Sequence, residues 1–378
     1  MTRVLHVGKY YPPVEGGIEN HVHSLVTGLA SRYEITALVF NTRAQTSQET
    51  LGGVRVVRVA TWGRILSTEM APSFFSWFLK LRHADIVHLH TPNPIGELAC
   101  LALPRTARLI ITYHSDVVRQ KLLGRLNRLV LHRLMRRAER IVAFTKRYME
   151  TSPVLQRYAE KCAIIPHGVD LDEMEATPEI RLRAEELKKI HGPRLALFVG
   201  RLVYYKGIDT LLRALVQVPD AKLAIVGDGP MRGPLEELAR GLGVASRVVF
   251  LGRVSHLEKV AWYLAADFLV LPATHRSEAF GLVQVEAMAC GLPVISTNID
   301  SGVPFVNRDQ ETGIIVEPSD PDGLAAAMSR LLDDAALRAR YGAAGRARVE
   351  RLFCRDVMLR DSVLLYEEVL GAPTAKRP

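Results

Sequence analysis

Residues 194–229 read RLALFVGRLVYYKGIDTLLRALVQVPDAKLAIVGDG. The apolar runs at 194–199 and 222–226 predict two buried strands, and the apolar positions of 208–216 recur with helical spacing between them. Strands that are apolar at nearly every position and alternate with helices are typical of a parallel sheet covered on both faces. The stretch therefore predicts a strand–helix–strand unit of a doubly wound α/β domain.

The same alternation extends along the chain in both directions. Further strands are predicted at 248–251, 268–271, 293–296 and 313–316, and before the quoted stretch at 2–7, 34–40, 54–59, 85–90, 108–113, 140–144 and 162–165. The polar stretch 169–193 separates the two series and is interpreted as a linker with a helix. We therefore expect two successive α/β sheets of similar size, followed by a long terminal helix.

Composition narrows the class of protein. The 378 residues suit two domains, and 48% hydrophobic with 24% charged residues excludes a disordered chain. No apolar run reaches the ~18–20 residues of a membrane span. The N-terminus lacks the pattern of a secretory signal, and the four cysteines are far apart, which together predict reduced thiols and a cytoplasmic protein.

Charge is unevenly distributed between the two halves. Residues 1–166 contain 23 Lys and Arg against 11 Asp and Glu, whereas the remainder contains 26 against 29. A basic half joined to a mildly acidic half indicates that only the first half meets an anionic partner, which could be nucleic acid, an anionic membrane surface or a phosphorylated substrate.

Several residues with functional chemistry lie where strands end, and ligands of open parallel sheets bind beyond the carboxyl ends of the strands. Gly16 and Gly17 precede a predicted helix, whose N-terminus would favour a phosphate; the alternative is a flexible turn. Arg201 and Lys206 follow the strand at 194–199 and could converge on one anion, as a fork and a point charge; the alternative is two solvated cations.

Two acids and one histidine complete the candidate site. Glu278 and Glu286 could bind two hydroxyl-bearing parts of one long ligand, although such a pair could also be solvated surface. His114 follows the strand at 108–113 and could hydrogen-bond a substrate oxygen, or it could be a structural histidine. Asp170-Leu171-Asp172 has the spacing of a D-x-D metal motif but is interpreted as a hinge with helix capping, and no other metal-ligand cluster stands out. The expectation is therefore a site without a metal.

Taken together, these motifs resemble those of family 4 glycosyltransferases, the retaining, nucleotide-sugar-dependent class with the GT-B fold. The matching motifs, in chain order, are Gly16-Gly17, Tyr113-His114-Ser115-Asp116, Gly200-Arg201 with Lys206-Gly207, and the E-x7-E element from Glu278 to Glu286. The resemblance implies two Rossmann-like doubly wound domains that face each other across a cleft. It implies an acceptor-binding domain at 1–168, a nucleotide-sugar-binding domain at 190–354, and a helix at 355–372 that crosses back to the first domain.

The resemblance also implies a role for each motif residue. Arg201 and Lys206 would hold the donor diphosphate, Glu286 the ribose hydroxyls and Glu278 the hydroxyls of the transferred sugar. His114 would contact the sugar near the reacting centre. The other implied donor contacts are the backbone N–H groups of Phe280, Gly281 and Leu282, the base-flanking loop at Val254, and the glycines Gly16 and Gly17. The family implies no metal and no cofactor besides the donor substrate.

The basic segment at 119–140 predicts an amphipathic helix. With the nearby aromatic stretch at 74–80, it favours docking on an anionic membrane surface; the alternative is a core-facing helix with a solvated cationic side. The implied localisation is cytoplasmic and peripheral on the inner face of the cell membrane.

The function predicted from the resemblance is retaining transfer of a hexose onto a lipid-linked or cell-surface-glycan acceptor. The donor types considered are GDP-mannose and UDP-GlcNAc or UDP-glucose. One alternative is a nucleotide-sugar 2-epimerase-like GT-B enzyme. Another is a non-enzymatic nucleic-acid-binding protein, but the chain lacks a helix-turn-helix, RRM or KH signature, so no nucleic-acid partner is expected.

Overall fold

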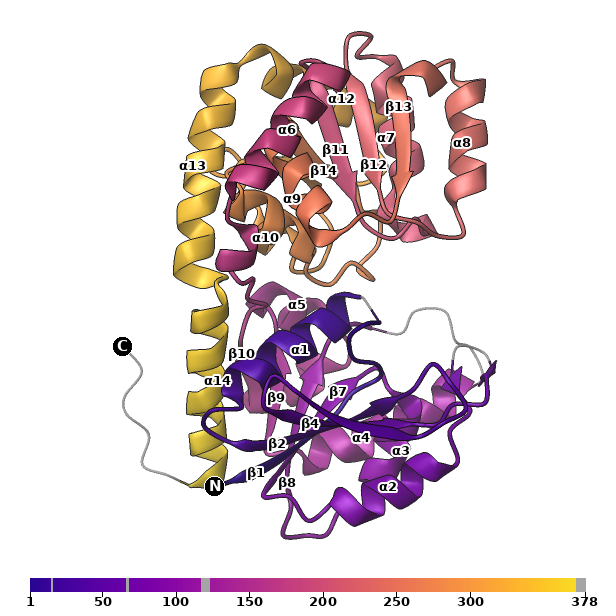
Figure 1. Cartoon of the computed structure of the whole chain (residues 1–378), viewed down its shortest axis with the longest axis vertical. Coiled ribbons are helices and arrows are strands. Elements are labelled where there is room, and N and C mark those ends of the chain that lie inside the picture. Colours follow the sequence, from indigo (N-terminus) through magenta and orange to yellow (C-terminus); the bar gives the residue numbers. More distant parts are fainter. Residues whose placement is uncertain (15, 66–67, 117–122, 372–378) are drawn as a thin grey trace. The chain divides into compact units, whose positions relative to one another are not determined.

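The structure is a computed structural model, and it describes residues 1–14, 16–65, 68–116 and 123–371. The chain divides into two compact units (Figure 1). Unit 1 consists of Met1–Gly168 together with the chain from Arg355 onward, and unit 2 is Val169–Cys354. Each unit is described by itself below.

The described residues of unit 1 form an eight-stranded sheet with the order β10-β9-β8-β7-β1-β2-β4-β3. All neighbouring strands are parallel except β3 and β4. The strands are β1 (Arg3–Val7), β2 (Glu34–Phe40), β3 (Ser47–Leu51), β4 (Val54–Val59), β7 (Ile86–Thr91), β8 (Arg108–Tyr113), β9 (Arg140–Ala143) and β10 (Cys162–Ile164), with a separate hairpin of β5 (Arg64–Ile65) and β6 (Thr68–Glu69). The helices are α1 (Gly17–Leu29), α2 (Ser73–Leu81), α3 (Pro94–Cys100), α4 (Leu123–Arg137), α5 (Lys146–Thr151) and α14 (Arg355–Leu370), with a 3-10 helix at Leu155–Lys161.

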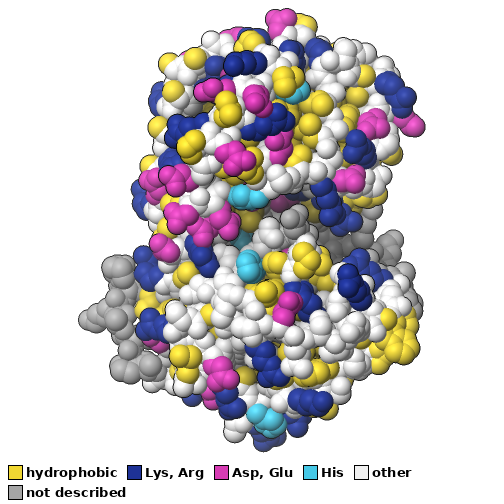
Figure 2. All heavy atoms as spheres, viewed as in Figure 1, with side chains coloured by type: hydrophobic (Ala, Val, Ile, Leu, Met, Phe, Trp, Pro, Cys, Tyr) yellow, Lys and Arg dark blue, Asp and Glu magenta, His cyan; other side chains and the backbone are white. Residues whose placement is uncertain are grey.

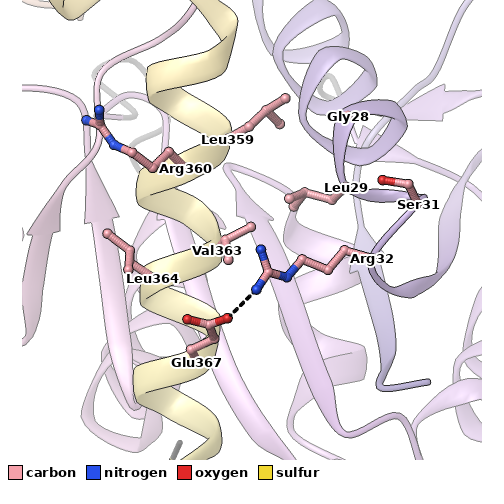
Figure 3. A pocket seen from close by; sticks show the side chains of 9 residues that line it. All are labelled: Gly28, Leu29, Ser31, Arg32, Leu359, Arg360, Val363, Leu364 and Glu367. Carbon is pink, nitrogen blue, oxygen red and sulfur yellow. Dashed lines mark hydrogen bonds and ion pairs between the residues drawn. The ribbon is translucent and has the colours of Figure 1, made fainter. Parts of the chain in front are cut away.

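The terminal helix α14 packs beside α1 on one face of this sheet (Figures 1 and 3). Gly28 permits the close approach, since a Cβ there would lie 2.4 Å from Leu359 Cδ1. A shallow pocket runs along the seam, where Arg32 forms a 2.7 Å ion pair with Glu367. None of the pocket's lining residues belongs to the predicted site, so we interpret it as a seam between packed helices.

The described residues of unit 2 form a six-stranded, all-parallel sheet with the order β13-β12-β11-β14-β15-β16. The strands are β11 (Leu195–Val199), β12 (Lys222–Val226), β13 (Val248–Gly252), β14 (Phe268–Leu271), β15 (Val294–Thr297) and β16 (Gly313–Val316). The helices are α6 (Pro178–His191), α7 (Ile208–Val216), α8 (Arg232–Gly241), α9 (His256–Ala265), α10 (Leu282–Ala289), α11 (Val303–Val306), α12 (Pro321–Asp333) and α13 (Ala335–Leu352), with 3-10 turns at Asp172–Met174, Tyr204–Lys206 and Ala245–Arg247. The strand order reverses between β11 and β14, which makes the carboxyl ends of these two strands the expected ligand-binding point.

These two sheets confirm the predicted doubly wound α/β class. Strands β2, β4, β8, β12, β14 and β16 have the predicted bounds, and the other predicted strands shift by one residue at one or both ends. Strand β3 was not predicted, because its sequence SQETL is polar and mostly exposed. Backbone pairing with β4 defines this edge strand, and a side-chain pattern does not reveal such pairing.

Histidines occupy alternate positions on the face of the unit 1 sheet that α14 covers. The register pairs His6 of β1 with His88 of β7 directly across the strands. We define the histidine cluster as six buried rings: His6 (β1), His21 (α1), His88 and His90 (β7), His114 (after β8) and His167 (after β10). Since side chains two apart on a strand share a face, the strands and the loops after them bring five of these rings together under α1 and α14, and His21 joins them from α1.

Burial keeps this cluster neutral. It lowers the pKa of His6 and His21 to about 3. It also lowers the pKa of the other four rings well below the usual 6.5, with neighbouring histidines adding to the effect. In the unfolded chain each ring regains a pKa near ~6.5. Unfolding below that pH therefore takes up protons that the folded state does not bind.

We expect the free energy of unfolding to fall steeply as pH drops below about 6.5, by up to roughly 1.4 kcal/mol per pH unit for each cluster histidine. The folded pKa values are depressed, so the stabilisation is complete above the unfolded pKa and is lost as pH falls towards the folded values. Denaturant unfolding monitored at a series of pH values between 7 and 5 measures the slope. His167→Gln should lower the number of protons taken up on unfolding, and so the slope, by about one proton. His83→Gln, at an exposed position of unit 1, serves as the control. Equal slopes for the two variants would contradict the assignment of buried, neutral rings.

Candidate active site

The loops that follow β11 and β14 meet at the carboxyl edge of the unit 2 sheet. The backbone N–H of Thr274 donates to the carbonyl of Tyr205 over 2.8 Å. Gly207 has a φ of +65°, and a Cβ there would lie 2.0 Å from the Pro272 carbonyl oxygen. Only glycine fits this contact, so the Lys206-Gly207 motif brings the two loops together at the topological switch point.

Lys206 and Glu278 form a buried ion pair across these loops. Lys206 Nζ lies 2.6 Å from Glu278 Oε2, and the two side chains are only 9% and 12% exposed. Gly200 leaves room for the ammonium group, since a Cβ there would lie 3.2 Å from Lys206 Nζ. Two residues 72 positions apart in the sequence thus form a mostly buried ion pair, and removal of either would leave the other charge unpaired.

Arg201 lies in the same loop as Lys206 but is exposed. Within the described part of the chain, its guanidinium group has no hydrogen bond or ion pair. The structure thus places one predicted cation in a buried pair and leaves the other available to an anion from solution.

Glu286 is held by two side chains of α9. The Tyr263 hydroxyl donates to Glu286 Oε2 over 2.7 Å, and Lys259 Nζ lies 3.0 Å from Oε1. Burial, reinforced by the Glu286 carboxylate, raises the pKa of Tyr263 well above its usual value, so this hydroxyl stays protonated and donates. Sequence reasoning missed Lys259 and Tyr263; their separation of four residues, which places both on one side of a helix, was the available signal.

Glu278 and Glu286 therefore lie in separate groups of charges. The turn between them ends at Gly281, which has a φ of +75° and begins α10. A Cβ at Gly281 would lie 2.7 Å from Leu271 Cδ2, so glycine fits here on both conformational and steric grounds. The first N–H groups of α10, including that of Leu282, have no intrahelical acceptor, which makes this helix start favourable for an anion.

Two other predicted residues flank this site. Phe280 is buried immediately before the α10 turn. Val254 is half-buried in the loop that follows β13, at the same carboxyl edge of the sheet. Both residues thus follow carboxyl ends of strands in the unit 2 sheet.

In unit 1 the two predicted glycines differ. A Cβ at Gly17 would meet nothing within 4 Å, so the backbone is open to a ligand there. A Cβ at Gly16 would lie 2.2 Å from Glu19 Oε2, so the Glu19 carboxyl already occupies that space. Burial raises the pKa of Glu19, and this opposes the stabilisation that a helix N-terminus gives to a carboxylate. Sequence reasoning did not identify Glu19.

His114 lies at the carboxyl end of β8 within the histidine cluster. Its Nε2 is 3.1 Å from His90 Nδ1, and its backbone N–H donates to Thr91 O over 3.0 Å. Its other ring nitrogen, Nδ1, has no hydrogen bond among the described residues. The ring is thus structurally fixed, as the structural alternative predicted, and its predicted contact with a substrate oxygen stays a prediction.

Two sets of three cluster histidines could geometrically hold a metal ion, with ligand nitrogens within 4.8 Å of one another: His6, His88 and His90, and His21, His90 and His114. In the first set both His88 nitrogens are already 2.7 Å from hydroxyl groups. In the second set His90 Nδ1 and His114 Nε2 contact each other. A metal would therefore have to displace existing hydrogen bonds in either set.

Surface charge follows the division seen in the sequence. On the face shown in Figure 2, Asp and Glu side chains are more numerous on unit 2, and Lys and Arg side chains occur on both units.

Two family models cover most of the chain. The model described as Glycosyltransferase Family 4 matches residues 15–173, and the model described as Glycosyl transferases group 1 matches residues 180–348. The chain is 32% identical over 371 residues to the O-antigen chain mannosyltransferase C of Escherichia coli, covering 97% of this chain and 99% of that protein. It is 36% identical over 354 residues to the D-rhamnosyltransferase WbpZ of Pseudomonas aeruginosa, covering 93% and 92%.

Solved structures agree on the fold. The sucrose-phosphate synthase (tll1590) of Thermosynechococcus elongatus superposes with a TM-score of 0.82 at 24% identity, covering 99% of this chain and 100% of that one. Anabaena Alr3699/HepE in complex with UDP-glucose gives a TM-score of 0.80 at 19% identity, covering 97% and 100%. The chain therefore belongs to glycosyltransferase family 4 and has the GT-B fold.

Proposed function

We propose that this glycosyltransferase moves a hexose, mannose in the first instance, from a nucleoside diphosphate donor to a lipid-linked or cell-surface-glycan acceptor. The buried Lys206–Glu278 pair beside the start of α10 is the observation that carries the proposal. A cation and a carboxylate side by side could bind the phosphate and the hydroxyl groups of a diphosphate sugar, which supports the proposal. The similar Mycolicibacterium smegmatis protein is described as a GDP-mannose-dependent alpha-(1-6)-phosphatidylinositol monomannoside mannosyltransferase, which supports GDP-mannose as the first donor to test.

When the donor binds, the ion pair between Lys206 and Glu278 opens. The donor diphosphate then contacts the Lys206 ammonium group and the exposed Arg201 guanidinium group. The released Glu278 carboxylate then accepts hydrogen bonds from hydroxyls of the transferred sugar. The N–H groups around Gly281 add donors at the helix start. A positive cluster that is already in place stabilises the charge that grows on the leaving diphosphate as its bond to the sugar breaks.

The neighbouring group on α9 and α10 suits the nucleoside end of the donor. Lys259 and Tyr263 hold the Glu286 carboxylate from one side, which fixes its direction. A carboxylate held in this way can accept two ribose hydroxyls, and the loop at Val254 flanks the base.

The reaction retains the anomeric configuration and proceeds without a metal. The acceptor hydroxyl attacks the anomeric carbon from the face of the leaving group, through an oxocarbenium-like state. As the new C–O bond forms, the bond to the diphosphate breaks, and a diphosphate oxygen takes the acceptor's proton. Arg201 and Lys206 supply the positive charge that this leaving group requires.

Unit 1 offers a surface for the membrane-linked end of the acceptor. Neighbouring helices α2, α3 and α4 expose Leu79, Leu98 and Leu129, which are 45%, 45% and 69% exposed. Arg128 and Arg133 of α4 are also exposed. Exposed leucines beside cations suit peripheral contact with an anionic bilayer. None of the helices in the described ranges is long and apolar enough to cross a membrane.

The aromatic part of the docking prediction is wrong at two positions. Phe74 and Phe78 are fully buried in unit 1, because their side of α2 faces the core. Trp77 is half-buried beside Lys80 Nζ, which lies 4.9 Å from its ring. Arg119 and Lys121, which belong to the predicted basic segment, lie outside the described residues.

Substitution of the ion pair should abolish most transfer. We expect Lys206→Ala and Glu278→Gln each to lower kcat/KM on the order of 10²-fold or more, because each removes charge that the transition state uses. The assay follows GDP release and product formation, and product analysis separates transfer from epimerisation. Lys222→Ala, at an exposed lysine of β12 in the same unit, is the matched control. Wild-type rates in both site variants would refute the site assignment.

A thermal-shift panel of nucleoside diphosphate sugars identifies the donor. A donor present at 100 times its dissociation constant should add about 2.7 kcal/mol to the stability of the unit that binds it. We expect GDP-mannose to give the largest shift and Glu286→Gln to reduce it. A larger shift with a UDP-sugar would reject the mannose assignment while keeping the site.

Liposome sedimentation tests membrane contact. Changing Arg128, Arg133 and Arg136 to Ser should weaken binding to anionic vesicles about a hundredfold at low salt, since each basic residue near such a surface contributes ~1 kcal/mol. The control changes three exposed arginines of unit 2, Arg330, Arg340 and Arg351, and thereby removes the same net charge. Equal losses in both triple variants would indicate non-specific attraction rather than docking through α4.

A further inference from the structure

A continuous row of hydrogen bonds runs through the histidine cluster to His114. We define the relay as Thr112, His88, Tyr366, His6, His90 and His114, in that order. The successive separations are 2.7 Å (Thr112 Oγ1 to His88 Nε2), 2.7 Å (His88 Nδ1 to Tyr366 OH), 3.2 Å (Tyr366 OH to His6 Nε2), 3.0 Å (His6 Nδ1 to His90 Nε2) and 3.1 Å (His90 Nδ1 to His114 Nε2). The row joins three strands to the terminal helix α14.

Each neutral ring in the row carries one proton on its two nitrogens. Both nitrogens of His88, His6 and His90 are engaged, so a ring that accepts on one side must donate on the other. The Tyr366 hydroxyl has one proton as well, and it therefore donates to one of its two histidines and accepts from the other. The direction of one hydrogen bond consequently fixes the direction of all five.

Only two proton orders are then possible. In the outward order Tyr366 donates to His6, His6 to His90, and His90 to His114, which leaves the His114 proton on Nδ1. In the inward order every bond is reversed, and His114 Nδ1 carries a lone pair. The rings stay neutral in both orders, in keeping with the depressed pKa values of the cluster.

Thr112 decides between the two orders. It is buried, and its hydroxyl has no hydrogen-bond partner among the described residues other than His88. In the outward order this hydroxyl donates to His88 Nε2 and its proton is satisfied. In the inward order it accepts, so its own proton and the His114 Nδ1 lone pair both lack a partner among the described residues. The outward order leaves only the His114 Nδ1–H without one in the ligand-free protein, and each unpaired buried polar group costs about 1–3 kcal/mol. The relay is therefore polarised outward.

We propose that Tyr366 is a positioning residue of unit 1: through His6 and His90 it holds His114 as the Nδ1–H tautomer, which donates a hydrogen bond to an oxygen of a bound substrate. This inference rests on the proposed function for the contact with a substrate. The tautomer of His114 is a property of the protein alone.

The terminal helix is anchored where this role requires it. Arg355 donates to Thr27 Oγ1 over 2.9 Å at the start of α14, and Arg140 pairs with Glu368 near its end. The Tyr366 ring packs edge-on against Tyr33, with centroids 5.4 Å apart. The helix that carries Tyr366 is thus fixed at both ends, and this holds the Tyr366 hydroxyl in the relay.

Tyr366→Phe removes the hydroxyl and keeps the ring in the core. Its matched control is Tyr33→Phe, which makes the same change on the neighbouring buried ring, whose hydroxyl forms no hydrogen bond with the relay. Nitrogen-15 NMR of histidine-labelled, ligand-free protein reports which nitrogen of each ring carries the proton, and the His114→Asn variant assigns the signal. We expect His114 to be a single Nδ1–H tautomer in wild type and Tyr33→Phe, and a mixture in Tyr366→Phe.

Thr112→Val tests the polarity at the other end of the relay and keeps the test decisive if Tyr366→Phe does not fold. It should also convert His114 to a mixture of tautomers. An Nε2–H tautomer in the wild type, or an unchanged tautomer in the folded relay variants, would overturn the proposal.

Kinetics then connect the tautomer to transfer. Tyr366→Phe should lower kcat roughly tenfold with KM within about twofold, the pattern expected when an interaction specific to the transition state is weakened. Tyr33→Phe should retain both constants. A changed tautomer with unchanged kcat would overturn the positioning role. If the wild type transfers no sugar from any donor, the proposed function fails, while the tautomer measurement still tests the relay.

Discussion

Parallel strands β11 and β14 are neighbours in the unit 2 sheet, and the chain leaves both at the same edge. This constraint organises the candidate site. It brings the loop that carries Lys206 against the loop that carries Glu278, although these residues are far apart in sequence. A lysine and a glutamate that are mostly withdrawn from water need each other, so the pair is both a structural requirement and a stored set of opposite charges for a ligand that carries phosphate and hydroxyl groups.

Unit 1 handles buried polar groups differently. Its sheet and α1 together bring six neutral imidazoles close to one another, and hydrogen bonds among them and with hydroxyls engage several of their nitrogens without introducing charge. The face that these rings occupy is covered by α14, the last helix of the chain, whose Tyr366 completes the row. Helix α14 therefore covers the sheet and also contributes to the environment of His114.

Much of the fold follows from local pattern. Apolar runs separated by helical periodicity placed the strands of both sheets, because a strand buried on both faces has few alternatives to continuous Val, Ile and Leu. The hydrophobic pattern did not predict the structure of segments that are buried on one side only or not buried at all. The polar strand β3 is held by backbone pairing with β4, and the aromatic helix α2 turns Phe74 and Phe78 inward, which composition does not reveal.

For the candidate site, the sequence by itself determined the candidate residue types: Lys206 and His114 were identifiable from their positions after strands, and Glu278 and Glu286 from the E-x7-E spacing. Only the tertiary structure decided their partners. Most of these contacts join separate elements: Lys259 and Tyr263 of α9 contact Glu286 of α10, and Tyr366 of α14 contacts His6 and His88. In one further case a side chain, Glu19, lies against a turn, at Gly16. The order of apolar and polar residues in a sequence indicates where the chain turns and which residues it buries. Which side chains then meet depends on strand order and helix packing, and these are set by the global burial of apolar surface.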